Sequence, residues 1–155
     1  MCSSDLGMKQ LGLMKGDVDE AVAAGAHALF MPHGIGHMMG LDVHDMEALG
    51  ENYVGYSDEV TRSSQFGTAF LRFALQYKPG HVFTIEPGCY FIPELIEKWK
   101  SEAKFKEYIN YDKLGRFMPI GGIRIDDDVR ITDKGQKVLG KPIPKTIKEI
   151  EAVCS

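Results

Sequence analysis

The sequence predicts an α+β domain, because strands are separated by loops and helices and several turns resemble those of hairpins. The chain has 155 residues, of which 44% are hydrophobic and 26% are charged, as is typical of a globular protein. This length allows one sizeable core. The sequence shows no internal repeat and no low-complexity linker, so we expect a single domain.

The first residues differ in character from the rest. Residues 1–6 (MCSSDL) have neither the basic start nor the long apolar run of a signal peptide. They are typical of a translated sequencing-adaptor tail, with an ordinary disordered terminus as the alternative. We expect residues 1–6 to be a non-native tail and the true protein to begin upstream, and we seek the fold in residues 7–155.

The first half of the chain predicts a helix and a strand before a glycine-rich loop. Asp17, followed three residues later by Glu20, has the spacing of a helix N-cap, which predicts a helix over about 17–26. The apolar run 28–31 ends at a proline and predicts a buried strand. Three glycines within residues 33–40 disfavour a helix and predict a loop.

The middle of the chain predicts two strands with a loop and a helix between them. Residues 41–45 alternate as in a strand, and residues 46–65 are typical of an irregular polar loop. Residues 69–77 have a weak helical period. Residues 81–86 are rich in β-forming residues and predict a strand that ends at a Pro-Gly pair.

The last third predicts a surface helix, a strand and a short final helix. Apolar and charged residues interleave over 93–109, which indicates a surface helix. Residues 123–131 are the clearest strand, with the isoleucines and Val129 on one face and charged residues on the other. Thr146 and Glu149 have the spacing of a capping box, which predicts a helix after them.

Composition excludes several classes of function. The formal net charge is -4 and there is no Lys/Arg run, so nothing indicates nucleic-acid binding. No stretch approaches the about 20 apolar residues of a membrane span. The widely spaced Cys2, Cys89 and Cys154 argue against a disulfide framework and favour a reducing compartment. We expect a cytoplasmic protein that binds neither nucleic acid nor membranes.

Three histidines in and after the glycine loop form the first candidate site. His33 and His37 lie in the loop, and His44 follows it. Glycines allow a ligand to approach the backbone, and imidazole is the commonest metal-ligating side chain. Because a lone histidine is more often structural, the pattern alone leaves both interpretations open. The glycine spacing misses the dinucleotide fingerprint by one position, which disfavours that function.

Two further candidate sites carry carboxylates. Pro87 holds Glu86 in an extended conformation at a strand end, where a buried carboxylate must be paired or bind metal and an edge carboxylate points to water. Arg124, Asp126 and Asp128 share one strand face. They form either a solvated charge ladder, worth about 1 kcal/mol or less per pair, or a metal ligand beside an anion-binding arginine. The HExxH, GxSxG and Walker signatures are absent from the sequence.

Three segments in this order identify a family. They are MPHGIGHMMGLDVHD (31–45), KPGHVFTIEPGCYF (78–91) and GGIRIDDDVRIT (121–132). Together they resemble the pita-bread metallopeptidases, and within these the prolidase and aminopeptidase P branch. The resemblance implies that residues 7–155 are the C-terminal part of a pita-bread (creatinase/aminopeptidase-like) catalytic domain, with a curved, mostly antiparallel sheet and flanking helices.

The resemblance implies a peptidase with two divalent metal ions that hydrolyses Xaa-Pro bonds. By this resemblance His37, Glu86 and Asp126 are metal ligands, and the oxygen-rich set favours Mn²⁺, with Co²⁺ or Zn²⁺ as alternatives. In this family a water shared by the metals becomes the nucleophile. His44, with His33, is then expected to donate to the developing oxyanion, and Glu86 to pass a proton to the leaving nitrogen.

The resemblance also implies the substrate and the partners. Arg124 lies beside the bridging ligand, and His33 and His44 contact the substrate. Arg72 stands where prolidases hold the terminal carboxylate of a dipeptide, which favours a dipeptidase over an aminopeptidase with longer substrates. We expect a small peptide with proline after the scissile bond as the substrate, and a homodimer as the full-length state.

Two departures from the family pattern bear on activity. Before His33 the only aspartates are Asp5, Asp17 and Asp19, and none matches the family's paired aspartate ligands. Asp126 replaces a glutamate and is one methylene shorter, while metal–oxygen distances tolerate only about ±0.2 Å. We therefore expect the isolated chain to be inactive. The alternatives are a non-catalytic pita-bread homologue that acts as a binding module, and a truncated product with no function of its own.

Overall fold

A computed structural model describes residues 2–155, with side chains described from residue 5 onward. The α-helices are α1 (Cys2–Gln10), α2 (Val18–Ala24), α3 (Glu47–Gly55), α4 (Pro93–Ser101), α5 (Tyr111–Leu114) and α6 (Ile147–Cys154). The 3-10 helices are η1 (Ala26–Leu29), η2 (Thr68–Phe70) and η3 (Met118–Ile120). The strands are β1 (Val82–Ile85), β2 (Gly88–Tyr90), β3 (Gly122–Arg124), β4 (Asp127–Thr132) and β5 (Gly135–Val138).

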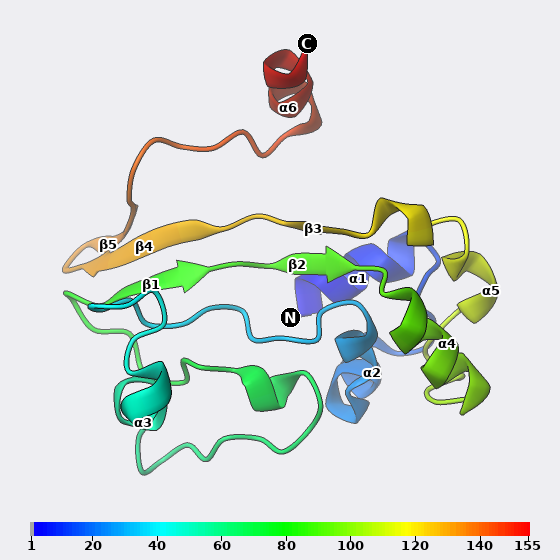
Figure 1. Ribbon diagram of the computed structural model, residues 1–155, viewed down its shortest axis with the longest axis horizontal. Coiled ribbons are helices and arrows are strands. Elements are labelled where there is room, and N and C mark those ends of the chain that lie inside the picture. The colour runs from blue at the N-terminus through cyan, green and yellow to red at the C-terminus, as the bar shows by residue number, and fades with distance from the viewer. Residues whose placement is uncertain (1) are drawn as a thin grey trace.

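The strands form a long antiparallel ribbon that crosses the molecule (Figure 1). β1 pairs with β4, β2 pairs with β3, and β5 adds to the other side of β4. The mixture of helices and antiparallel strands confirms the α+β prediction. The ribbon brings residues near 86 and residues near 126 to the same point of the fold.

The ribbon is interrupted between its two ladders. Residues 86–87 on one strand face residues 125–126 on the other, and the amide of Ile125 donates to the carbonyl of Pro87 at 3.1 Å. Pro87 has no N–H to donate, which removes a ladder hydrogen bond at this position. The register pairs on either side of this gap are Ile85 with Asp127 and Gly88 with Arg124.

The hydrophobic core lies at the end of the ribbon where α1, α2, α4 and α5 gather (Figure 1). Ile96 and Trp99 of α4 are three residues apart and point into this core, and burying each contributes about 1.5–3 kcal/mol. Phe30, just before the glycine loop, packs edge-on against Phe91 after β2, with ring centroids 6.0 Å apart. The other buried members are Leu13, Met14, Ala21, Ala26, Ala28, Leu29, Ile109 and Leu114.

Three predicted elements in the first half were wrong. Residues 28–31 are buried as predicted, but they form the end of η1 and a turn because the chain reverses directly after α2 at the left-handed Gly25. Residues 41–45 are bends with Leu41 fully exposed, so their alternation faces solvent and not the core. Residues 69–77 are helical only within η2. The rest has no regular secondary structure, and the Ala74 amide donates a hydrogen bond to the carbonyl of Gly55.

Three further predictions require correction. The helix predicted over 93–109 ends at Ser101, because Ala103 and Phe105 both have φ of 51° and break it. The strand predicted over 123–131 is divided into β3 and β4 by the gap. The loop predicted over 46–65 contains α3, which is itself bent at Gly50 with φ of 147°.

The predicted helix ends are confirmed. Asp17 caps α2 by accepting a hydrogen bond from the Glu20 amide at 3.0 Å, and Thr146 and Glu149 form the capping box of α6. Residues 33–40 form a loop, as predicted. Helix α1 includes part of residues 1–6; Met1 lies outside the described residues, and the origin of this segment stays a prediction.

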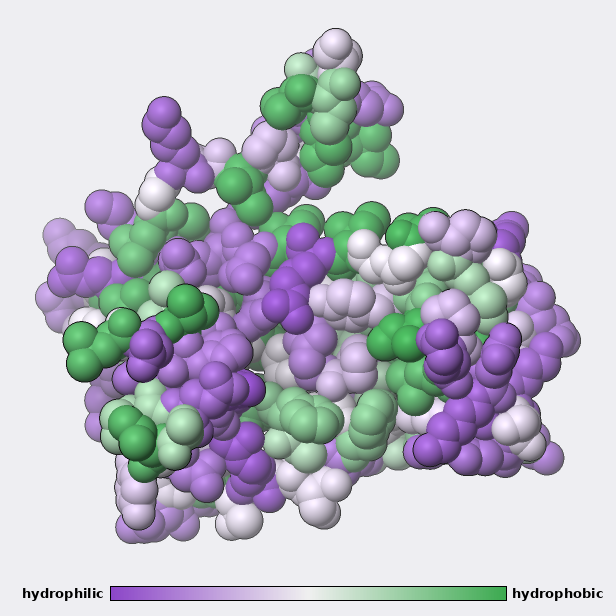
Figure 2. Space-filling model, in the orientation of Figure 1, coloured by the Kyte–Doolittle hydropathy of each residue, from purple (hydrophilic) through white to green (hydrophobic). Residues whose placement is uncertain are grey.

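Helix α6 stands apart from the body of the molecule (Figure 1). Its hydrophobic side chains are exposed and gather on it in Figure 2. Of the helices in residues 2–155, none has the length and apolar character needed to cross a membrane. The cysteines whose side chains are described, Cys89 and Cys154, are both free thiols, and burial raises the pKa of Cys89.

Candidate active site

The predicted site residues converge on one cavity of about 320 Å³. It lies between the glycine loop, the end of β1, and the segment that carries Arg72. Its lining residues are Pro32, His33, Gly34, Gly36, His37, His44, Phe70, Arg72, Glu86 and Arg124. Every residue predicted for the site, apart from Asp126, is therefore at its wall.

Glycines allow the loop to lie directly on β1. A Cβ atom at Gly36 would overlap the carbonyl oxygen of Thr84, which shows why no side chain fits there. The loop then hydrogen-bonds to β1 like an extra strand, with Thr84 N donating to His37 O at 2.9 Å and Glu86 N donating to Ile35 O at 2.8 Å. These bonds place His37 beside Glu86.

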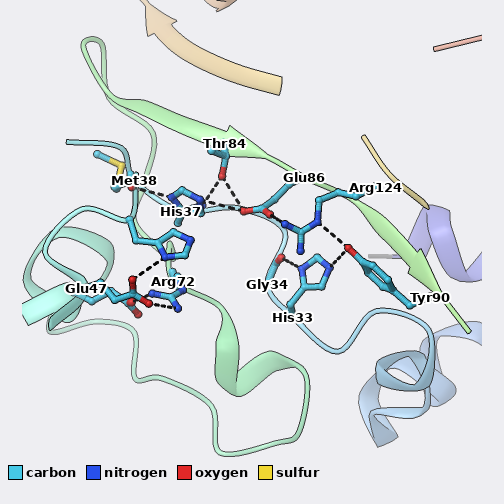
Figure 3. Close-up of polar contacts among 12 residues, drawn as sticks. His33, Gly34, His37, Met38, Glu47, Arg72, Thr84, Glu86, Tyr90 and Arg124 are labelled. Carbon is cyan, nitrogen blue, oxygen red and sulfur yellow. Dashed lines mark hydrogen bonds and ion pairs between the residues drawn. The ribbon is translucent and has the colours of Figure 1, made fainter. Parts of the chain in front are cut away.

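His37 and Glu86 form the buried centre of the site (Figure 3). Nδ1 of His37 lies 3.0 Å from the carbonyl oxygen of Met38, which can only accept, so Nδ1 carries a hydrogen. Nε2 then faces Oε1 of Glu86 at 3.3 Å. A neutral His37 would place two acceptors against each other, an arrangement that needs a proton or a cation between them. A histidine that ligates a metal usually donates its other N–H to such a carbonyl.

Glu86 is only 7% exposed, which excludes the interpretation in which it points to water. Its Oε1 accepts a hydrogen bond from Thr84 Oγ1 at 3.1 Å. Its Oε2 is paired with Nη1 of Arg124 at 2.6 Å. The two carboxylate oxygens thus have different neighbours, with the histidine and hydroxyl on one side and the guanidinium on the other.

Tyr90 joins Arg124 to His33 (Figure 3). Nε of Arg124 donates to the Tyr90 hydroxyl at 2.7 Å, and this bond raises the pKa of Arg124. His33 Nδ1 must donate to the carbonyl of Gly34, at 2.6 Å, so the Tyr90 hydroxyl donates to His33 Nε2 at 3.2 Å. Sequence reasoning missed Tyr90, although it lies inside the motif that carries Glu86.

His44 and Arg72 meet at Glu47, a residue that sequence reasoning also missed. The ring of His44 stands edge-on to that of His37, with centroids 4.2 Å apart. Nδ1 of His44 donates to Oε2 of Glu47 at 2.9 Å, while Nη2 of Arg72 lies 2.7 Å from Oε1. The hydrogen bond from His44, and then that from Arg72, lower the pKa of Glu47. Nη1 of Arg72 is also paired with Glu51.

Asp126 lies in the ribbon gap opposite Glu86 and is exposed. Partial burial, then Glu86 and Asp128, raise its pKa, whereas Arg124 and His37 lower it. Among the side chains that the structure describes, residues 5–155, no three His, Cys, Asp or Glu side chains are grouped so that they could hold a metal ion. The donor set therefore fits a metal only in part, through His37 and Glu86.

Comparisons with known proteins agree on the chain's relatives. Residues 6–133 match the model of metallopeptidase family M24. The human Xaa-Pro dipeptidase is 40% identical over 145 residues, which are 94% of this chain and 28% of that protein. A probable Xaa-Pro aminopeptidase of Aspergillus clavatus is 36% identical over 149 residues, with 96% and 30% covered. The chain thus spans between a quarter and a third of the length of these relatives.

Solved structures give the same result. An aspartate-to-alanine variant of Escherichia coli aminopeptidase P is 32% identical, with a TM-score of 0.63 over 98% of this chain and 26% of the other. A zinc-substituted E. coli aminopeptidase P in complex with product is 33% identical, with a TM-score of 0.62 over 96% and 26%. These likenesses extend over nearly the whole chain. Residues 6–133, which match the family model, include every residue that lines the cavity.

Proposed function

Because this chain belongs to metallopeptidase family M24, we propose that its cavity is part of the active site of a peptidase that hydrolyses Xaa-Pro bonds. The names of the human and fungal relatives support the Xaa-Pro specificity. The observation that carries the proposal is the buried pair of His37 and Glu86, whose acceptor atoms face each other at 3.3 Å. Such a pair is suited to a cation.

The family name implies divalent metal ions, and we propose Mn²⁺ as the native one. When bound, such ions polarise a carbonyl and make water a nucleophile at neutral pH. Nε2 of His37 and Oε1 of Glu86 would hold one of them. Asp126, across the gap from Glu86, is the proposed third ligand of this chain, and it needs to come closer to that pair than it lies here.

His44 is proposed to stabilise the negative charge that develops on the scissile carbonyl oxygen. Its Nδ1 donates a hydrogen bond to Oε2 of Glu47, which fixes the orientation of the ring at the cavity wall. His33 has both ring nitrogens engaged, by Gly34 and Tyr90, so we assign it to substrate contact beside His44. Glu86 is proposed to pass a proton to the leaving nitrogen.

Arg72 and Arg124 are the proposed substrate-binding cations. Arg72 reaches the cavity wall and suits the terminal carboxylate of an Xaa-Pro dipeptide, because a guanidinium can bind a carboxylate through two hydrogen bonds. Arg124 holds Oε2 of Glu86 and orients that carboxylate. Three points stay predictions: the homodimer, the cytoplasmic location, and the assignment of residues 7–155 to the C-terminal part of a catalytic domain.

A chimera tests the proposed function without reference to where this chain begins. Residues 7–155 replace the matching segment of the human Xaa-Pro dipeptidase, and hydrolysis of Gly-Pro is measured with Mn²⁺, Co²⁺ or Zn²⁺. We expect hydrolysis, and its loss in the His37→Ala and Glu86→Ala variants but not in Lys98→Ala on α4. A chimera that unfolds cooperatively yet hydrolyses nothing with any of these metals would favour the non-catalytic binding module.

A further inference from the structure

We propose that Glu47 determines substrate specificity by competing with the substrate's carboxylate for Arg72. This inference rests on the proposed function, in which Arg72 binds the terminal carboxylate of a dipeptide. Glu47 is the first residue of α3, and it does not itself line the cavity. It acts through two residues that do, so its role is one of positioning.

The two oxygens of Glu47 serve different partners (Figure 3). Oε1 lies 2.7 Å from Nη2 of Arg72, and Oε2 lies 2.9 Å from Nδ1 of His44. Nη1 of Arg72 is paired with Glu51. Both terminal nitrogens of the guanidinium are therefore occupied by carboxylates of the protein itself, and a substrate carboxylate has to displace one of them.

Glu47 is the acid that is displaced more easily. The side chain of Glu51 is 16% exposed and is also paired with Arg62, which in turn bonds to Asn52. The side chain of Glu47 is 52% exposed, and water competes well for exposed ion pairs. A ligand carboxylate would replace Glu47 at Nη2 while Glu51 keeps Nη1 in place.

This exchange leaves His44 attached to Glu47. Because the bond to His44 uses the other oxygen of Glu47, loss of the Arg72 contact does not require loss of the His44 contact. A ligand without a terminal carboxylate cannot form an ion pair with Nη2 of Arg72, so it does not displace Glu47. Any ligand that needs Arg72 must therefore break the ion pair between Glu47 and Arg72, at a cost in binding free energy. Only a ligand carboxylate offsets that cost, because it forms a new ion pair with Arg72.

The test uses the full 155-residue chain without metal and two probes, Gly-Pro and its C-terminal amide. Affinities come from the shifts of backbone amide signals in NMR titrations. We expect Glu47→Gln to bind Gly-Pro about two- to fivefold more tightly than the wild type, the range that follows from the strength of an exposed ion pair. Binding of the amide should not change. Glu97→Gln, which makes the same charge change on α4, should leave both affinities as they are.

A second background separates this inference from the proposed function. In Arg72→Gln, Gly-Pro should bind more weakly, and adding Glu47→Gln should then have no effect. If Arg72→Gln leaves Gly-Pro binding unchanged, the assigned role of Arg72 fails. If Arg72→Gln weakens binding but Glu47→Gln binds no more tightly than the wild type, only the role of Glu47 is overturned. Absence of detectable binding in both the wild type and Glu47→Gln overturns it as well.

Discussion

Nε2 of His37 and Oε1 of Glu86 lie 3.3 Å apart in a part of the cavity wall that is almost closed to solvent. The hydrogen on His37 is held on the opposite nitrogen by the carbonyl of Met38. The acceptor atoms of the two side chains therefore face each other in a geometry that a single cation can bridge.

We predict that the 155-residue chain binds Zn²⁺ or Co²⁺ weakly at this pair. Addition of the metal should move the His37 side-chain signals in NMR spectra, and saturating metal should raise the melting temperature, because a ligand that binds only the folded state stabilises it. His37→Ala should abolish the rise in melting temperature. His81→Ala, at a histidine outside the cavity lining, is the matched control, and an equal loss there would contradict the assignment.

Arg124 should stabilise the folded chain through its ion pair with the buried carboxylate of Glu86. Arg124→Gln leaves a buried carboxylate without its cation, and we expect a loss of about 1–3 kcal/mol in the free energy of unfolding in urea. Adding Glu86→Gln removes the unpaired buried charge and should recover part of the lost free energy of unfolding. A double variant as unstable as the sum of the two single variants would show that the residues do not interact.

Gly36 is predicted to be irreplaceable in the loop that carries His37. Gly36→Ala places a methyl group against the carbonyl of Thr84 and should destabilise the fold by about 3 kcal/mol or more, measured by denaturant unfolding. Gly115→Ala is the matched control, because a methyl group there meets open space at an ordinary φ of -53°. It should be neutral or stabilising by about 0.4–1 kcal/mol. Equal effects would contradict the close approach.

Asp5 of α1 should destabilise the folded chain at neutral pH. It is buried beside His27, and neither Asp5 Oδ2 nor His27 Nδ1 has a hydrogen-bond partner among the described residues. Burial raises the pKa of Asp5 above its ordinary 3.8, and burial lowers that of His27 below 6.5. Asp5→Ala should therefore raise the unfolding free energy at pH 7 by about 1–2 kcal/mol.

The sign of the pH dependence follows from the direction of the Asp5 shift. With a raised pKa, the folded state holds its proton more tightly, so the penalty is present above the ordinary value of 3.8 and disappears as the pH falls below it. The difference between the wild type and Asp5→Ala should accordingly shrink between pH 7 and pH 3. Asp133→Asn, at an exposed site, should show no such trend, and a constant difference for Asp5→Ala would rule out an ionisation effect.

The sequence predicted the central residues of the site better than it predicted the hydrogen bonds that connect them to other side chains. His37 and Glu86 stand out in the sequence because glycines and proline impose local geometry on them. Tyr90 bonds to His33 across 57 positions of the chain, and no local pattern signals such a contact. Glu47 was likewise hidden, because α3 begins within a stretch whose composition indicated a loop.

The errors in secondary structure have one physical origin. Alternation over residues 41–45 predicts a strand only if its apolar face packs on a core, and here the apolar Leu41 and Val43 are exposed. The segment 69–77 has helical period, but the backbone of Ala74 and Leu71 finds partners in residues 55–56. In both cases tertiary contacts, or their absence within the described chain, decided the conformation.

The gap in the ribbon also bears on whether the shorter Asp126 can reach a metal ion in place of the family's glutamate. The two ladders, one containing β1 and β4 and the other β2 and β3, end on opposite sides of residues 125–126. A small relative rotation of the two halves would alter the separation of Glu86 and Asp126 without breaking a ladder hydrogen bond. The spacing of the two carboxylates therefore depends on how the backbone is arranged at the gap between the ladders, and not on the length of either side chain alone.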